Sequence, residues 1–155
     1  MNKRCSDQVE CSQRNRKGRV RGSAVIEASL LAPWMLFLLV GVLDLGFYYY
    51  AAITTENAAR VAAHYGAAGA STAGDSTGAC TYAVQEALTL PGVSSGMNCQ
   101  SLPFIVTVTA VAGPDGSPAS NASVTYRTMP MIPIPGLLPG NLTLTRTVQM
   151  RVKSY

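Results

Sequence analysis

One carboxylate stands at the start of a long apolar segment, five residues after a glycine that ends a basic leader. The residues run Arg21-Gly22-Ser23-Ala24-Val25-Ile26-Glu27. A carboxylate in such surroundings is costly unless it is paired or reaches water. If the chain were cut after Gly22, the new α-amine of Ser23 would be a cation able to pair with Glu27 of a neighbouring subunit. Alternatively, Glu27 lies at the cytoplasmic interface near a helix start, where the helix dipole favours negative charge. The residues alone leave both interpretations open.

The rest of the chain offers few groups for other chemistry. The sequence has a single histidine, His64, and eight acidic residues, and it contains no phosphate-binding loop or nucleophile motif. Since no second histidine and no cysteine or carboxylate cluster accompanies His64 at zinc-like spacing, we interpret it as a solvated residue rather than a metal ligand. We therefore expect no enzyme activity, no cofactor and no metal site.

The element that must position Glu27 is a membrane-spanning helix. Residues 28–53 read ASLLAPWMLFLLVGVLDLGFYYYAAI, with Asp44 as the one ionisable carboxylate. About twenty helical residues span roughly 30 Å, the thickness of the hydrocarbon core of a bilayer. We therefore predict a transmembrane helix over residues 23–50, embedded in membrane lipid, with a helical extension outside the membrane over residues 51–70.

The distribution of charge predicts the orientation of this helix. The leader, residues 1–22, carries seven Lys and Arg and two acidic residues, for a net charge of +5, and the other 133 residues carry −1. The positive-inside rule then places the leader in the cytoplasm and the chain after residue 50 outside.

Because the body of the chain has no basic face, we expect no nucleic-acid partner. A cleavable signal peptide is the alternative, but its leader would be unusually long and no A-x-A site follows Leu43.

Two residues inside the apolar segment are unusual there. Pro33 removes the backbone hydrogen bond to the Ser29 carbonyl and predicts a loosened or kinked helix. The kink either helps the helix bend into a filament or is simply tolerated. Asp44 lies seventeen residues beyond Glu27, roughly 25 Å along the axis. We expect its carboxylate near the outer interface, reaching water rather than a neighbouring helix.

The outer part, residues 71–155, is predicted to be a small α+β domain. Its hydrophobic period changes from helical spacing to an alternation of apolar residues with threonine. The pattern predicts a linker over 69–79, a helix over 81–90, strands over 104–112 and 122–128 joined by a turn at 114–116, and a third strand over 141–152. The expected fold is a helix across one face of a three-stranded antiparallel sheet.

Residues 21–66 resemble a known family. They read RGSAVIEASLLAPWMLFLLVGVLDLGF and run on into TENAARVAAHYGA. This segment resembles the TadE-like minor pilins (pseudopilins) of the tight-adherence (Tad/Flp) secretion and pilus systems. The matching positions are Gly22, Glu27, Pro33, Gly41, Asp44, Gly46, Ala58, Ala59, Arg60 and Ala62. Position 28 departs from the pattern, because it is Ala where major pilins and many TadE-like chains carry an aromatic residue.

The resemblance implies a minor pilin that prepilin peptidase cuts between Gly22 and Ser23. Its partners would be other Tad pilus subunits and inner-membrane platform proteins, and it would prime or stabilise a filament for surface adhesion and biofilm formation. It would lie in the inner (plasma) membrane or in a surface pilus, with a pilin-like periplasmic or extracellular domain. The alternative is an uncleaved, membrane-anchored envelope protein whose outer domain binds a partner.

The four cysteines sort by compartment. Cys80 and Cys99 lie on the outer, oxidising side, whereas Cys5 and Cys11 lie on the reducing side. We predict a Cys80–Cys99 disulfide, which closes a loop of about twenty residues, and unpaired thiols at Cys5 and Cys11. The proline-rich apolar stretch over 129–140 either covers the domain's own core or contacts another subunit or the membrane.

Overall fold

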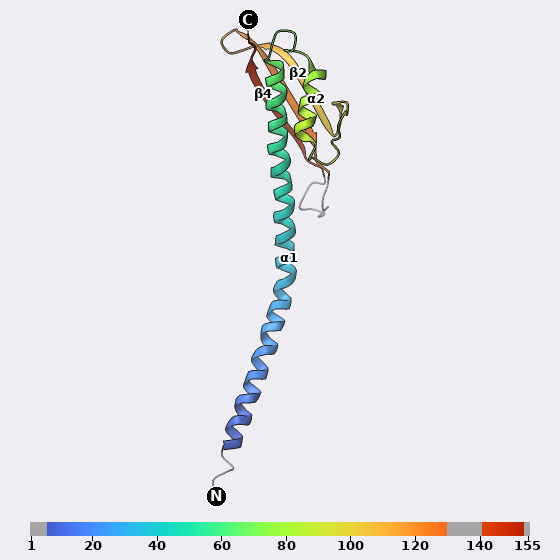
Figure 1. Ribbon diagram of the computed structural model, residues 1–155. Helices are drawn as coiled ribbons and strands as arrows, with labels where there is room; N and C mark the ends of the chain where they lie inside the picture. The colour runs from blue at the N-terminus through green and yellow to red at the C-terminus, as the bar shows by residue number, and fades with distance from the viewer. Residues whose placement is uncertain (1–5, 130–140, 154–155) are drawn as a thin grey trace. The chain divides into compact units, whose positions relative to one another are not determined.

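The structure is a computed structural model, and it describes residues 6–129 and 141–153, with side-chain environments from Ala24 onward. The chain forms two compact units, Met1–Leu43 and Asp44–Tyr155. Helix α1, Ser6–Gly66, begins in the first unit and ends in the second (Figure 1). It begins within the basic leader.

The described part of the first unit is an exposed apolar helix. Most of its large hydrophobic side chains from Val25 to Leu43 are exposed, and Trp34 is 70% exposed. From Ala24 onward the helix is long and apolar enough to cross a membrane. A water-soluble helix would bury such a surface, so these side chains need lipid or another helix to cover them.

The second unit is an α+β domain, as predicted. Its elements after α1 are helix α2 (Ser76–Ala87) and strands β1 (Gln100–Ser101), β2 (Phe104–Ala112), β3 (Pro118–Arg127) and β4 (Thr143–Arg151). The strands form one antiparallel sheet in the order β1-β2-β3-β4. The predicted strand over 104–112 and its hairpin partner are confirmed, but the sheet has four strands and not three.

The additional strand is too short to show a pattern in the sequence. β1 has only two residues, and it pairs with β2 through Gln100 opposite Ile105 and Ser101 opposite Phe104. The Cys99 carbonyl accepts a hydrogen bond from the Val106 backbone N–H at 3.0 Å, immediately before the strand. Pairing across a tight turn, and not alternation of side chains, therefore creates β1.

One face of the sheet makes the core of this unit with both helices. The sheet contributes Phe104, Val106, Val108, Ala122, Val124 and Tyr126, α1 contributes Ala51, Ala58, Ala59, Ala62 and Ala63, and α2 contributes Ala79, Ala83, Val84 and Ala87. The helix side chains are small, which lets the helix backbones come close to the sheet. A Cβ on Gly66, for example, would collide with the side chain of Ser120.

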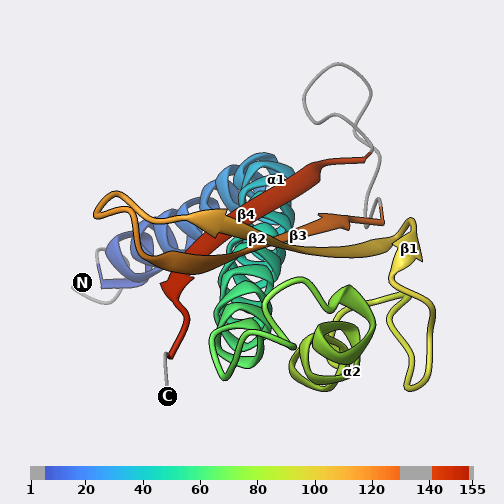
Figure 2. The same ribbon diagram turned by 90° about the horizontal axis from the view of Figure 1, so that it is seen from above.

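Helix α2 lies beside the C-terminal part of α1 in both views (Figures 1 and 2). The rings of Tyr65 on α1 and Tyr82 on α2 have their centroids 5.1 Å apart. The opposite face of the sheet carries polar side chains, among them Thr125 and Thr145, whose hydroxyls are 3.0 Å apart. The sheet is thus apolar toward the helices and polar toward solvent, the usual arrangement in an α+β domain.

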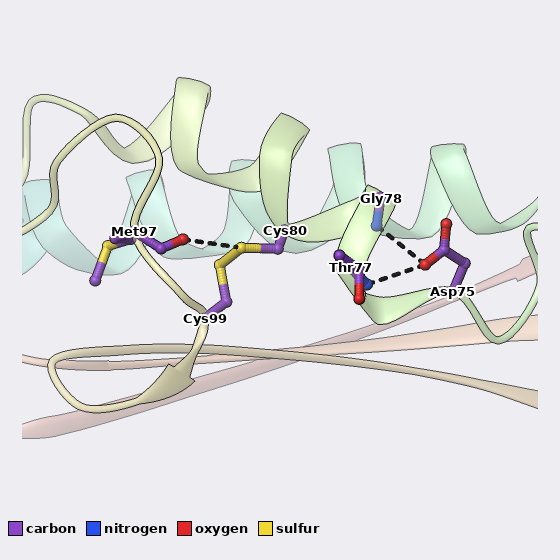
Figure 3. Close-up of a disulfide and its surroundings, with 6 residues drawn as sticks. All are labelled: Asp75, Thr77, Gly78, Cys80, Met97 and Cys99. Carbon is purple, nitrogen blue, oxygen red and sulfur yellow. Dashed lines mark hydrogen bonds between the residues drawn. A yellow bond between two sulfur atoms is a disulfide. The ribbon is translucent and has the colours of Figure 1, made fainter.

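Helix α2 begins five residues before its predicted start, so the predicted linker over 69–79 is too long. The reason is the side chain of Asp75, which accepts hydrogen bonds from the backbone N–H groups of Thr77 at 3.1 Å and Gly78 at 3.0 Å (Figure 3). These are the groups that the first turn of a helix leaves without partners. The Asp-Ser-Thr sequence was therefore a capping signal rather than part of a linker.

Candidate functional site

The predicted cleavage and assembly residues lie on α1. Gly22 and Ser23 belong to a continuous helical backbone, although their surroundings lie outside the residues with described side chains. Glu27 is exposed on the same helix. Because Ser23 and Glu27 are four residues apart, they share a helix face at a separation of about 6 Å along the axis. After cleavage, the α-amine of Ser23 would therefore be within reach of the Glu27 carboxylate of its own chain as well as of the Glu27 carboxylate of a neighbouring subunit.

The helix is uninterrupted at Pro33, which is exposed. One turn earlier the Ser29 hydroxyl donates a hydrogen bond of 2.8 Å to the Ile26 carbonyl. That bond does not replace the one that Pro33 cannot donate to the Ser29 carbonyl. The role of Pro33 as a kink thus stays a prediction.

Asp44 lies in the second unit, and the expectation that its carboxylate reaches water was wrong. Its side chain is only 3% exposed, and neither carboxylate oxygen has a hydrogen-bond partner. Asp44 shares a helix face with the buried residues Ala51, Thr55 and Ala58, at intervals of seven, four and three residues. The sequence could not reveal this burial, since it depends on the tertiary contacts of that face.

The structure joins Cys80 and Cys99 in a disulfide between α2 and the segment before β1 (Figure 3). Their Cα atoms are 5.8 Å apart, and Cys99 is buried. The Cys80 sulfur lies 3.6 Å from the Met97 carbonyl oxygen. Cys5, the side chain of Cys11 and the proline-rich residues 130–140 lie outside the described residues.

Polar residues recur along the outer end of α1. Arg60 donates to the Glu56 carboxylate at 2.6 Å, as their spacing of four residues predicts, and His64 is exposed one turn later. Among the residues with described side chains, no three histidines, cysteines or carboxylates gather as metal ligands would.

Sequence reasoning missed a largely apolar hollow in the second unit, of about 530 Å³. Its lining comes from α1 and the turn after it, α2 and β4, and consists of Arg60, Val61, His64, Tyr65, Ala68, Tyr82 and Met150. The two tyrosines are contributed by different helices, so no short stretch of sequence could indicate it.

Comparison with known protein families matches residues 22–64 to the family described as TadE-like protein. No curated protein and no solved structure matches the chain. The matched segment begins at Gly22 and contains Glu27, Pro33 and Asp44, so it covers the exposed apolar helix and the first part of the core. The chain therefore carries a TadE-like segment, which confirms the resemblance drawn from its sequence.

Proposed function

We propose that this chain is a minor pilin, or pseudopilin, of a tight-adherence pilus. The observation that carries the proposal is the TadE-like segment, residues 22–64, on a helix whose apolar side chains are exposed. The family associates the chain with the tight-adherence pilus systems. An exposed apolar helix suits such a protein, because it can lie in lipid before assembly and pack against other helices afterwards.

In this proposal the basic leader stays in the cytoplasm and the second unit lies outside the inner membrane. Prepilin peptidase cuts between Gly22 and Ser23, and the shortened chain joins other subunits through its helix. The chain then primes or stabilises a filament that serves surface adhesion and biofilm formation. Its role is structural rather than catalytic.

N-terminal sequencing of the membrane-extracted protein tests this proposal. We expect the sequence to start at Ser23. An intact leader would favour an uncut membrane anchor, and a start beyond residue 50 would instead indicate a secreted domain behind a signal peptide.

Two observations favour the uncut anchor as a second candidate. Helix α1 is continuous across Gly22 and Ser23, so a peptidase would have to unwind it locally. Ala28 also departs from the aromatic residue that many TadE-like chains carry. In this case the second unit would act as an anchored domain that binds an envelope partner.

The substitution Gly22→Val separates these two candidates. Valine restricts the backbone at the scissile bond and stabilises a helix slightly better than glycine does, so both effects oppose cleavage. We expect the variant to keep its leader and to run about 2 kDa above the processed wild type on an immunoblot. This difference is the mass of the 22 leader residues, taken as their share of a chain of 155 residues and 16.3 kDa.

The matched control is Gly18→Val, the same change four residues earlier in the leader. It should be processed like the wild type in cells that contain the peptidase. If the wild-type protein runs at full length whether or not the peptidase is present, cleavage at Gly22 is contradicted and the anchor becomes the better account.

The substitution Glu27→Gln tests the charge pair with the Ser23 amine. We expect insertion and cleavage to stay near normal, while co-purification with the other pilus subunits falls by roughly tenfold or more, because an amide cannot replace a carboxylate opposite an ammonium group.

Glu56→Gln is the control, since Glu56 lies on the same helix but is bound to Arg60. That variant should co-purify like the wild type. Undiminished association of the Glu27→Gln variant would show that the carboxylate of Glu27 has no part in assembly.

A further inference from the structure

Strand β4 is the last strand of the sheet, and among the described residues only β3 pairs with it. At one end of this ladder the Thr128 N–H donates to the Leu142 carbonyl at 2.9 Å. At the other end the Val152 N–H donates to the Pro118 carbonyl at 2.9 Å. Because bonded and unbonded pairs alternate along an antiparallel ladder, every second residue between these ends turns its backbone groups away from β3. These residues are Thr143, Thr145, Thr147, Gln149 and Arg151.

The opposite edge of the sheet is closed over the first half of β2. β1 pairs with its first residues, the Val106 N–H donates to the Cys99 carbonyl at 3.0 Å, and the Val108 N–H donates to the Ser76 hydroxyl at 2.9 Å. In contrast, no residue that the structure describes forms a hydrogen bond with the outward backbone groups of β4. Such an open edge is a template for pairing with a further strand.

Arg146 places a positive charge on the helix-covered face of this open edge. Its register partner on β3 is Val124, which is fully buried, so the Arg146 side chain leaves β4 on the face that makes the core. On that face it lies between Leu144 and Val148, which pack against the core. Arg146 is nevertheless exposed, and it forms no ion pair with a described residue. The edge thus presents an unpaired cation between two apolar side chains.

A second copy of this chain does not bring the matching charge. None of the four described strands contains an aspartate or a glutamate, and β4 itself carries two arginines. A charged side chain on the covered face of an edge strand discourages pairing with a purely apolar strand, because the charge would be buried without a partner. Arg146 therefore selects against strands that lack an acid.

We propose that the edge of β4 binds an extended segment of a different protein, in which an Asp or Glu lies two positions from an apolar residue on either side. The segment adds as an antiparallel strand, since every described strand pair is antiparallel. Arg146 then belongs to a pair without backbone bonds, in which the facing side chains come closest. The acid meets the guanidinium, and the apolar neighbours extend the contact with Leu144 and Val148. This binding requires the folded second unit, and neither cleavage at Gly22 nor a membrane.

Peptide binding to the full-length protein in detergent tests this assignment. Two fluorescent nine-residue peptides, the length of β4, alternate valine with threonine and are identical except for Glu or Lys in place of the central valine. Salt at about 0.15 M screens the distant basic leader. We expect the wild type to bind the Glu peptide at least about fivefold more tightly than the Lys peptide, as measured by fluorescence anisotropy. Opposite charges that face each other across two strands attract, and like charges repel.

Variants of Arg146 assign this preference to one side chain. Arg146→Gln should lose most of the preference for the Glu peptide, and Arg146→Glu should reverse it, which would also show that the reversed variant is folded. The matched control is Arg151→Gln, which removes the same charge from the same strand. Since the Arg151 side chain lies on the other face and is bound to Asp115 at 3.4 Å, this variant should keep the wild-type preference.

Hydrogen exchange resolved to single residues shows whether the peptide adds as a strand. Without peptide, the outward N–H groups of Thr145 and Thr147 should exchange rapidly, whereas those of Arg146 and Val148 are bonded to β3. Saturating Glu peptide should slow exchange of the outward groups at least about fivefold and leave the other two nearly unchanged.

Equal affinity of the wild type for the two peptides would overturn the inference, as would unslowed exchange of the outward groups in the bound state. Protection of these groups before peptide is added would also overturn it, because the edge would then be covered by this chain itself or by a second copy. Protection that rises with protein concentration would identify the second copy.

Discussion

At the scale of single residues, Asp75 connects the two helices of the second unit. Its carboxylate caps α2 and also accepts a hydrogen bond of 2.8 Å from the Tyr65 hydroxyl on α1. The hydrogen bonds from the Gly78 N–H and the Tyr65 hydroxyl hold the pKa of Asp75 below its ordinary value of 3.8. Because the pKa is lowered in the folded state, the charged carboxylate stabilises the fold above pH 3.8, and this stabilisation is lost as the pH falls through the lowered pKa.

We expect Asp75→Asn to lower the melting temperature at pH 7 and to have little effect at strongly acidic pH, as measured by circular dichroism of the detergent-solubilised protein.

The control is Asp75→Ala, which removes the capping oxygen as well as the charge. Asparagine is itself a good capping residue, so the Ala variant should melt below the Asn variant throughout the pH range. A wild-type minus Asn difference that does not shrink in acid would contradict the role assigned to the charge.

At the scale of elements, the Cys80–Cys99 disulfide joins α2 to the segment immediately before β1. Sequence separation between the two cysteines is 19 residues, and a loop of this size contributes on the order of 3 kcal/mol in the chain-entropy model. We therefore expect the double variant Cys80→Ala and Cys99→Ala to unfold at a clearly lower urea concentration than the oxidised wild type. Non-reducing peptide mapping of the wild type should find this pair linked, with Cys5 and Cys11 open to alkylation in the unprocessed chain.

Reduction provides the matched control, because the reduced wild type should approach the stability of the double variant. A link between Cys5 or Cys11 and either outer cysteine would contradict both the pairing and the predicted membrane topology.

At the scale of the whole molecule, the described hydrophobic core belongs to the second unit. Its buried cluster runs from Ala51 on α1 to Tyr126 on β3 and includes no residue before Asp44. We therefore expect a fragment of residues 44–155 to fold without the preceding helix. Circular dichroism should show helix and strand, and urea unfolding should be cooperative.

A fragment of residues 60–155 is the comparison, since it lacks the core residues Ala51, Ala58 and Ala59. It should be much less stable, because the sheet then loses part of the helix that covers its apolar face. Equal stability of the two fragments would mean that this part of α1 contributes little to the fold.

Features that depend on a local pattern of residues could be predicted from the amino-acid sequence. A long run of apolar residues predicts a helix able to span a membrane, because this depends on length and composition alone. The alternation of Val and Thr predicted β2 with the bounds that the structure has, Phe104–Ala112. The position of charges relative to the apolar run predicted which cysteines share a compartment, and the structure joins that pair. The TadE-like segment was visible for the same reason, since its residues are contiguous.

Features that depend on residues distant in the chain could not be predicted in this way, because long-range contacts create them. β1 exists because two residues find a partner strand across a turn, and the apolar hollow exists because Tyr65, Tyr82 and Met150 converge from three elements. Asp44 follows the same rule. Its place in an apolar run suggested a carboxylate that reaches water, but whether a side chain reaches water depends on what packs over its helix face, and that is determined by long-range contacts.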